Sequence, residues 1–158
     1  MMELSKEKAL YKAAAYCSMA EHCVYEVQQK LERWGASAEV MEEVIAYLKR
    51  ENYLDESRYC SSFIHDKLHY NKWGRLKMAH ALRLKQIKTS FFEPYLLAID
   101  EEIYTTILSE LLASKSRAIK ARSLYERKGK LIRFAVGRGF EMDKVIALLN
   151  HLPDEEDM

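Results

Sequence analysis

His65 and His69 are the residues whose spacing first suggests chemistry, because they lie four positions apart in a stretch with helical periodicity. On a helix, two histidines at this spacing project from the same face and could ligate a metal ion. A metal site needs further ligands, and no cysteine, acidic pair or H-E-x-x-H frame accompanies them. We therefore interpret both as partly exposed helix histidines and predict no metal site.

Motifs of enzymatic catalysis are absent from the rest of the sequence. It contains no glycine-rich phosphate loop, no G-x-S-x-G and no carboxylate pair in a glycine-framed loop. His22 precedes Cys23 at an expected helix start, which suits helix capping better than acid–base catalysis. The sequence thus predicts a protein that is not an enzyme, needs no cofactor and acts through binding.

The composition favours an all-α protein of the cytoplasm. Its 158 residues are 49% hydrophobic and 31% charged, and only 5 Gly and 2 Pro can break helices. Three cysteines without a CxxC pattern are expected to be buried, reduced thiols. No apolar signal core begins the chain, and no run of about 18 apolar residues could span a bilayer, so we expect no membrane partner.

Positive charge is unevenly distributed, although the formal net charge is only +1. Residues 1–60 carry 8 basic and 11 acidic side chains, residues 61–90 carry seven basic and one acidic, and residues 115–138 carry nine basic and one acidic. The net charge near zero argues against a protein that binds nucleic acid through positive charge over its whole surface. The two basic runs are either solvated helix faces or parts of a binding surface.

Apolar residues recur with a period near fifty residues. The first stripe, at Met41, Val44, Ile45 and Leu48, returns at Phe92, Tyr95, Leu96 and Ile99, and again at Val145, Leu148, Leu149 and Leu152. The helix before it repeats in the same way, at Val27 and Leu31, then Met78 and Leu82, then Leu131 and Ala135. The pattern predicts three tandem three-helix repeats that form an elongated, curved helical array.

A short turn joins the last two helices of each repeat. Gly35 and Gly139 suit the left-handed residue that follows a helix end. Gln86 stands at the same place in the second repeat, where that conformation would cost about 1 kcal/mol. We expect the repeats to span residues 1–54, 55–99 and 100–153, followed by an acidic tail at 154–158.

Capping residues mark several expected helix starts. Ser5 is a plausible N-cap for the first helix, and Ser123 with Glu126 has the pattern of a capping box. The first helix of the third repeat is expected to bury the stripe formed by Ile103, Ile107, Leu108, Leu111 and Leu112.

The segment "NYLDESRYC" (52–60) lies where the first repeat meets the second. Asp55 can accept backbone hydrogen bonds at a helix N-terminus, where its charge also suits the helix dipole. Leu54 and Tyr59 are placed as a hydrophobic staple around this start. We interpret Tyr53, Leu54, Asp55 and Arg58 as a structural joint.

The distribution of basic residues disfavours base-specific reading of DNA. A recognition helix carries Arg, Lys, Asn or Gln on its outer face, yet the third helices, such as "AEVMEEVIAYL", are poor in them. The basic residues lie instead on the second helices of the second and third repeats. Such faces suit a charged groove that is contacted without base readout.

Four segments, in order along the chain, resemble the RecX regulatory proteins. "YLDESRYCSSFIHDK" (53–67) is similar to the family signature Tyr-Leu-Asp-Asp-x-Arg-Phe-Ala-x-x-Phe. The segments 16–31, 73–82 and 130–146 resemble further family patterns, the last through Leu-x-Arg-Phe-Leu-x-Arg-Gly-Phe. The chain departs from the pattern at Arg75, which replaces a proline, and at Ala20, where arginine is common.

The resemblance implies three three-helix repeats and a regulator of the RecA recombinase. Family members lie in the groove of the RecA–DNA filament and hinder filament extension, ATP hydrolysis, strand exchange and co-protease activity in the SOS response. For this chain it implies a RecA filament as partner, and we expect a monomer. Alternative interpretations are a sequence-independent binder of single- or double-stranded DNA, and a helical-repeat scaffold for an unrelated partner.

The candidate partner- or DNA-binding residues are the basic side chains of the second and third repeats. They are Arg75, Lys77, Lys85, Arg117, Lys120, Arg122, Lys130, Arg133 and Arg138. The alternative is that about half of them are solvated helix faces and that Arg133 pairs with an internal carboxylate.

Replacing Asp55 by Ala should lower the free energy of unfolding by about 1 kcal/mol, because the N-cap hydrogen bonds are lost. Thermal unfolding followed by circular dichroism measures this change. An unaltered melting temperature would show that no helix is capped at this position.

Overall fold

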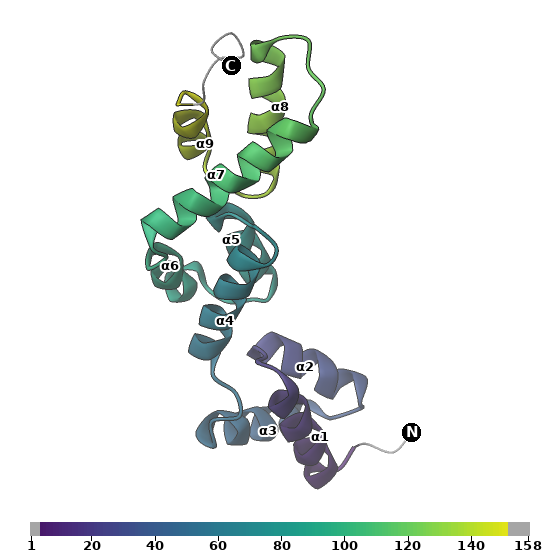
Figure 1. Ribbon diagram of the computed structural model, residues 1–158. Helices are drawn as coiled ribbons and strands as arrows, with labels where there is room; N and C mark the ends of the chain where they lie inside the picture. The colour runs from purple at the N-terminus through teal and green to yellow at the C-terminus, as the bar shows by residue number, and fades with distance from the viewer. Residues whose placement is uncertain (1–3, 152–158) are drawn as a thin grey trace. The chain divides into compact units, whose positions relative to one another are not determined.

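The fold is all-α, as predicted: the computed structural model describes residues 4–151, which form nine helices and no strand (Figure 1). The helices are α1 (Lys6–Met19), α2 (Val24–Arg33), α3 (Ala38–Arg50), α4 (Glu56–His69), α5 (Arg75–Leu84), α6 (Thr89–Leu97), α7 (Glu101–Ala118), α8 (Leu124–Gly137) and α9 (Met142–Leu149). They fall into three consecutive groups of three. Leu152 and the predicted acidic tail lie outside the described residues. Among the described residues, no helix is both long and apolar enough to cross a membrane.

The predicted helix starts are confirmed at both serines. The Ser5 hydroxyl accepts a hydrogen bond from the Lys8 N–H, and the Ser123 hydroxyl accepts one from the Glu126 N–H at 3.1 Å. The expected capping box is only half formed, because the Glu126 carboxylate accepts from the Arg122 N–H rather than from Ser123. Glu126 therefore ties the preceding loop to α8.

The turns between second and third helices repeat one backbone conformation. Gly35, Gln86 and Gly139 have φ angles of 89°, 60° and 96°, all in the left-handed region. Gln86 does adopt the conformation of the two glycines, at a cost of about 1 kcal/mol for a side chain there. The shared conformation at equivalent places supports tandem repetition of one three-helix motif.

Packing divides the chain into two compact units. Unit 1 comprises Leu84–Ile87 and the described part of Met1–Phe63, and unit 2 comprises Ile64–Arg83 and the described part of Lys88–Met158. The division does not follow the repeats, because the turn after α5 belongs to the same unit as α1, α2 and α3.

The core of unit 1 forms between α1, α2 and α3. The predicted core residues Val27, Leu31, Val44, Ile45 and Leu48 are all buried there. Alanines of α1 and Leu54 complete the cluster, and Met41 is only partly buried at its edge. This arrangement confirms the apolar periodicity of α2 and α3.

The three cysteines are free thiols, and all lie in unit 1. Cys23 and Cys60 are buried as expected, whereas Cys17 is only half-buried, so the expectation of three buried thiols was wrong for it. Burial raises the pKa of each thiol to about 11. All three therefore remain protonated at neutral pH.

Unit 2 buries the equivalent stripes of the second and third repeats. Met78, Leu82, Leu131 and Ala135 are at most 1% exposed, which confirms their predicted core positions. The expectation for Ile103 was wrong, because its side chain is 47% exposed. Tyr104 is fully buried instead, and its ring lies 5.2 Å from that of Phe140.

The C-terminal turn of α8 is joined to the N-terminus of α5 by backbone hydrogen bonds. The Gly74 N–H donates to the Arg138 carbonyl at 2.8 Å, and the Leu76 N–H donates to the Gly139 carbonyl at 3.0 Å. These bonds satisfy donors that a helix start leaves free and acceptors at a helix end. A Cβ atom on Gly74 would lie 2.4 Å from the Gly139 backbone, so only glycine permits this approach.

The Gly74→Ala variant should lose at least about 2 kcal/mol of stability, because neither backbone segment can yield to the added methyl group. Chemical denaturation measures this loss. Gly137→Ala is the matched control, because its Cβ would meet no atom within 4 Å. There, loss of backbone entropy in the unfolded chain should raise stability by about 0.5–1 kcal/mol. Equal stabilities of the two variants would refute the close packing at Gly74.

Candidate functional site

The predicted joint at 52–60 lies at the start of α4. The Asp55 carboxylate accepts hydrogen bonds from the N–H groups of Ser57 and Arg58, at 2.8 and 3.2 Å. The Arg58 guanidinium donates to the Asn52 carbonyl at 2.9 Å and to Glu21 at 3.0 Å. Tyr53 is 39% exposed and Leu54 is buried. These contacts hold the chain between α3 and α4.

The same arrangement occurs at the start of α7, where no joint was predicted. The segment "IDEEIY" (99–104) matches "LDESRY" (54–59) in its aspartate, glutamate and tyrosine. The Asp100 carboxylate caps α7 by accepting from the Ile103 N–H at 3.0 Å. Tyr59 and Tyr104 are both buried. The signal that could have revealed it is the repeated apolar-Asp-Glu-x-x-Tyr pattern.

Tyr104 connects three elements of unit 2 through its hydroxyl group. The hydroxyl donates to Glu141 at 2.5 Å and accepts from the Arg75 N–H at 3.0 Å. Burial, reinforced by the hydrogen bond to Glu141, raises the pKa of Tyr104. The phenol therefore stays protonated and remains a hydrogen-bond donor.

Arg75 is held by internal partners rather than being presented to solvent. Its guanidinium donates to the Leu96 carbonyl at 3.0 Å, to Glu141 at 3.0 Å and to Glu101 at 2.9 Å. It also lies 4.0 Å from the centre of the Tyr104 ring, and its side chain is only 13% exposed. A proline at this position, as in the resembling pattern, has no N–H to donate to Tyr104. The departure from the pattern thus supplies a hydrogen bond.

Lys85, which follows α5, is also held by a partner inside the protein, Glu26 of α2 in unit 1. Its ammonium group contacts Glu26 at 3.1 Å, and Glu26 also accepts from the Cys23 N–H at 3.2 Å. His22 lies 3.2 Å from the same carboxylate, beside the start of α2 as expected. Burial alone would raise the pKa of Glu26, but the hydrogen bonds from Lys85, Cys23 and His22 outweigh it and lower the pKa. The ionised carboxylate therefore stabilises unit 1, and this contribution is lost as the pH falls through the lowered value.

Lys77 and Arg138 lie at the α5–α8 joint. The Lys77 ammonium group is 4.7 Å from the centre of the Trp73 ring. The Arg138 guanidinium donates to the carbonyls of Lys72, at 3.2 Å, and Asn71. Four of the nine candidate basic residues are thus engaged in joints between helices.

The other five candidates gather on the end of α7, the loop 119–123 and α8. They are Arg117, Lys120, Arg122, Lys130 and Arg133, and we call them the α7–α8 basic surface. All except Lys130 are exposed, and none of those four forms an ion pair with a described residue. Arg133, for which internal pairing was the alternative, is among the exposed side chains.

Hydrogen bonds from α8 fix the loop that carries Lys120 and Arg122. The Arg127 guanidinium donates to the carbonyls of Ser116, at 2.5 Å, and Ile119, which fixes the loop. Lys130 donates to the Lys120 carbonyl at 2.8 Å and pairs with Glu126 at 3.2 Å. The chain therefore folds the loop back onto α8 and brings its basic residues to one region of unit 2.

His65 and His69, the pair considered as possible metal ligands, lie on α4. The rings of His65 and His69 lie 4.4 Å apart. Among residues 4–151, no group of three or more His, Cys, Asp or Glu side chains could hold a metal ion.

Comparison with known proteins places this fold among tandem three-helix domain proteins. Residues 9–48 match the RecX first three-helix domain, and residues 55–90 match the RecX second three-helix domain. The crystal structure of RecX from Lactobacillus salivarius aligns with a TM-score of 0.78 at 19% identity, over 93% of this chain and 96% of that one. Another structure, of regulatory protein RecX, gives a TM-score of 0.80 at 17% identity, over 92% and 75%.

Sequence relatives extend the similarity over almost the whole chain. The regulatory protein RecX of Prosthecochloris aestuarii is 30% identical over 96% of this chain and 98% of its own length. That of Ralstonia pickettii is 24% identical over 99% of both. The Lactobacillus johnsonii protein is 27% identical, and this chain covers only 50% of its length. The chain belongs to the RecX family of regulatory proteins.

Replacing Tyr104 by Phe should lower stability by about 1–3 kcal/mol, because the Arg75 N–H and the Glu141 carboxylate lose a buried partner. Denaturant titration measures the loss. The matched control is Tyr125→Phe, which removes a hydroxyl from a side chain that is 89% exposed and should leave stability unchanged. If the two variants are equally stable, the Tyr104 network does not hold unit 2 together.

Proposed function

We propose that this chain binds in the groove of the RecA–DNA filament and inhibits filament extension, ATP hydrolysis, strand exchange and co-protease activity. It would thereby modulate recombination and the SOS response, as a cytoplasmic monomer without enzymatic activity. Membership of the RecX family carries this proposal. The accessible α7–α8 basic surface supports it, because a nucleoprotein filament offers acidic groups, above all DNA phosphates.

Tandem repetition also suits a filament as the target. Three successive three-helix groups offer several separate contact surfaces on one chain. When one contact has formed, the others bind at a high effective concentration, so modest local affinities combine. A filament of identical protomers can present the matching contacts repeatedly.

The four candidate basic residues with partners inside the protein have a different part in this proposal. Arg75, Lys77 and Arg138 are engaged within unit 2 and support the α7–α8 basic surface by maintaining its fold, whereas Lys85 stabilises unit 1. We assign direct contact with the filament to Arg117, Lys120, Arg122, Lys130 and Arg133.

A second candidate function is sequence-independent binding to single- or double-stranded DNA. Tyr125 favours it, because this side chain is 89% exposed in the first turn of α8, within the same basic stretch. An exposed aromatic ring beside basic residues can stack on an unpaired base. Several phosphate contacts would make such binding weaken steeply with salt.

The Arg117→Glu/Arg133→Glu variant should require roughly tenfold more protein to inhibit ATP hydrolysis by RecA of the same organism on single-stranded DNA, because attraction becomes repulsion. The control is Lys8→Glu/Lys12→Glu, which makes the same charge change at two exposed positions of α1. Its inhibition should equal that of the unaltered protein. Circular dichroism would establish that both variants are folded.

Two results would contradict the proposal. If the unaltered protein does not inhibit at any ratio up to equimolar, the filament is not its target. If both variants inhibit equally, the α7–α8 basic surface is not the contact. A salt titration on naked DNA separates the second candidate: strong, salt-sensitive binding to DNA with no preference for filaments would favour plain DNA binding.

A further inference from the structure

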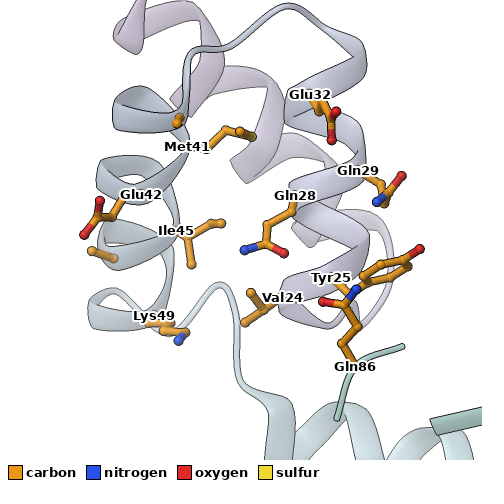
Figure 2. A pocket seen from close by; sticks show the side chains of 12 residues that line it. Val24, Tyr25, Gln28, Gln29, Glu32, Met41, Glu42, Ile45, Lys49 and Gln86 are labelled. Atoms are coloured by element: carbon orange, nitrogen blue, oxygen red, sulfur yellow. The ribbon is translucent and has the colours of Figure 1, made fainter. Parts of the chain in front are cut away.

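A second surface lies on unit 1, in a groove between α2 and α3 (Figure 2). Its volume is about 710 Å³. The residues that line it include Val24, Gln28, Glu32, Met41, Ile45 and Lys49. None of them belongs to the α7–α8 basic surface, so the groove has no assigned role in the proposed function.

The α3 wall of the groove is long enough for about three turns of a bound helix. On α3 the lining residues recur at helical spacing from Ala38 to Lys49, a length of about 17 Å along the axis. The side chains of Met41 and Ile45 point from α3 towards α2, as Figure 2 shows. Ala38 and Ala46 keep the α3 wall low. An apolar floor between two helices is the arrangement by which proteins bind an amphipathic helix.

The charge of the rim specifies the occupant. Glu32 and Glu42 line the groove, are exposed, and form no ion pair with a residue in the described range. Lys49 is the only basic side chain among the lining residues. Residues 1–60 as a whole also carry 11 acidic against 8 basic side chains. A bound segment must therefore complement an acidic rim.

We propose that the α2–α3 groove binds a basic amphipathic helix of a partner protein. Aliphatic side chains of that helix pack on Val24, Met41 and Ile45, and its Lys or Arg residues pair with Glu32 and Glu42. Val24 and Met41 are half-buried and Ile45 is buried, so the floor is a shallow apolar strip between polar side chains. This surface is opposite in charge to the α7–α8 basic surface, and it is independent of binding to DNA.

The test uses a fluorescein-labelled Lys/Leu peptide of about 14 residues whose leucines follow one helical face. Fluorescence anisotropy should show binding to the full chain, and a peptide of the same composition in scrambled order should bind at least about tenfold more weakly, because it has no apolar face. Glu32→Lys/Glu42→Lys should weaken binding roughly tenfold by turning attraction into repulsion. Ala46→Trp, which fills the groove from an exposed position, should abolish it.

Two control variants separate the groove from general effects. Glu39→Lys makes the same charge change on α3 at an exposed residue that does not line the groove, and Ala15→Trp adds the same bulk on α1. Both should bind the peptide normally, and circular dichroism should show native helix content for every variant. Equal binding of the scrambled peptide, or equal weakening by Glu39→Lys, would overturn the proposal in favour of unspecific charge attraction. If groove variants instead change the concentration-dependent mass of the protein alone, the occupant is a second copy of the chain, which also overturns it.

Discussion

The backbone contact between Gly74 and the turn at Gly139 is the constraint on which the organisation of unit 2 depends. Two helix ends meet there, so the free N–H groups of α5 pair with the free carbonyls of α8 without any intervening side chain. The close approach puts the Arg75 N–H within reach of Tyr104, and Tyr104 in turn engages Glu141. Since unsatisfied polar groups at buried helix ends are costly, each of these bonds supports the next.

The role of each basic residue depends on whether it lies near a contact between helix ends. A guanidinium or ammonium group near a helix joint finds carbonyls and carboxylates within the protein, as Arg75 and Arg138 do. A basic residue on the outer face of α7 or α8, such as Arg117 or Arg133, forms no hydrogen bond or ion pair with residues 4–151 and is exposed. The number of positive charges in a stretch of sequence therefore exceeds the number that an external partner can use.

Local signals made much of the fold predictable. The serine caps and the buried stripes of α2 and α3 depend on residues close in sequence, and the structure confirms them. Apolar periodicity alone placed Ile103 in the core, whereas the buried residue is Tyr104, whose hydroxyl bonds to Arg75 and Glu141, far away along the chain. The α2–α3 groove was equally invisible, because periodicity showed Met41 and Ile45 as core residues but not the opening beside them. The sequence predicted which basic residues were candidates for binding. Which of them are exposed depends on how the loop 119–123 folds against α8.

The three protonated cysteines give the molecule an internal reporter of its own opening. All of them lie in unit 1, and the thiolate rather than the thiol reacts with alkylating reagents, so the folded unit resists labelling. Opening of α1, of the N-terminus of α2 or of the part of α4 that belongs to unit 1 would return the thiols to water and restore ordinary reactivity. The rate of alkylation therefore measures local opening of unit 1 with the chain's own cysteines as labels. Unit 2 contributes no signal, because its described part has no cysteine.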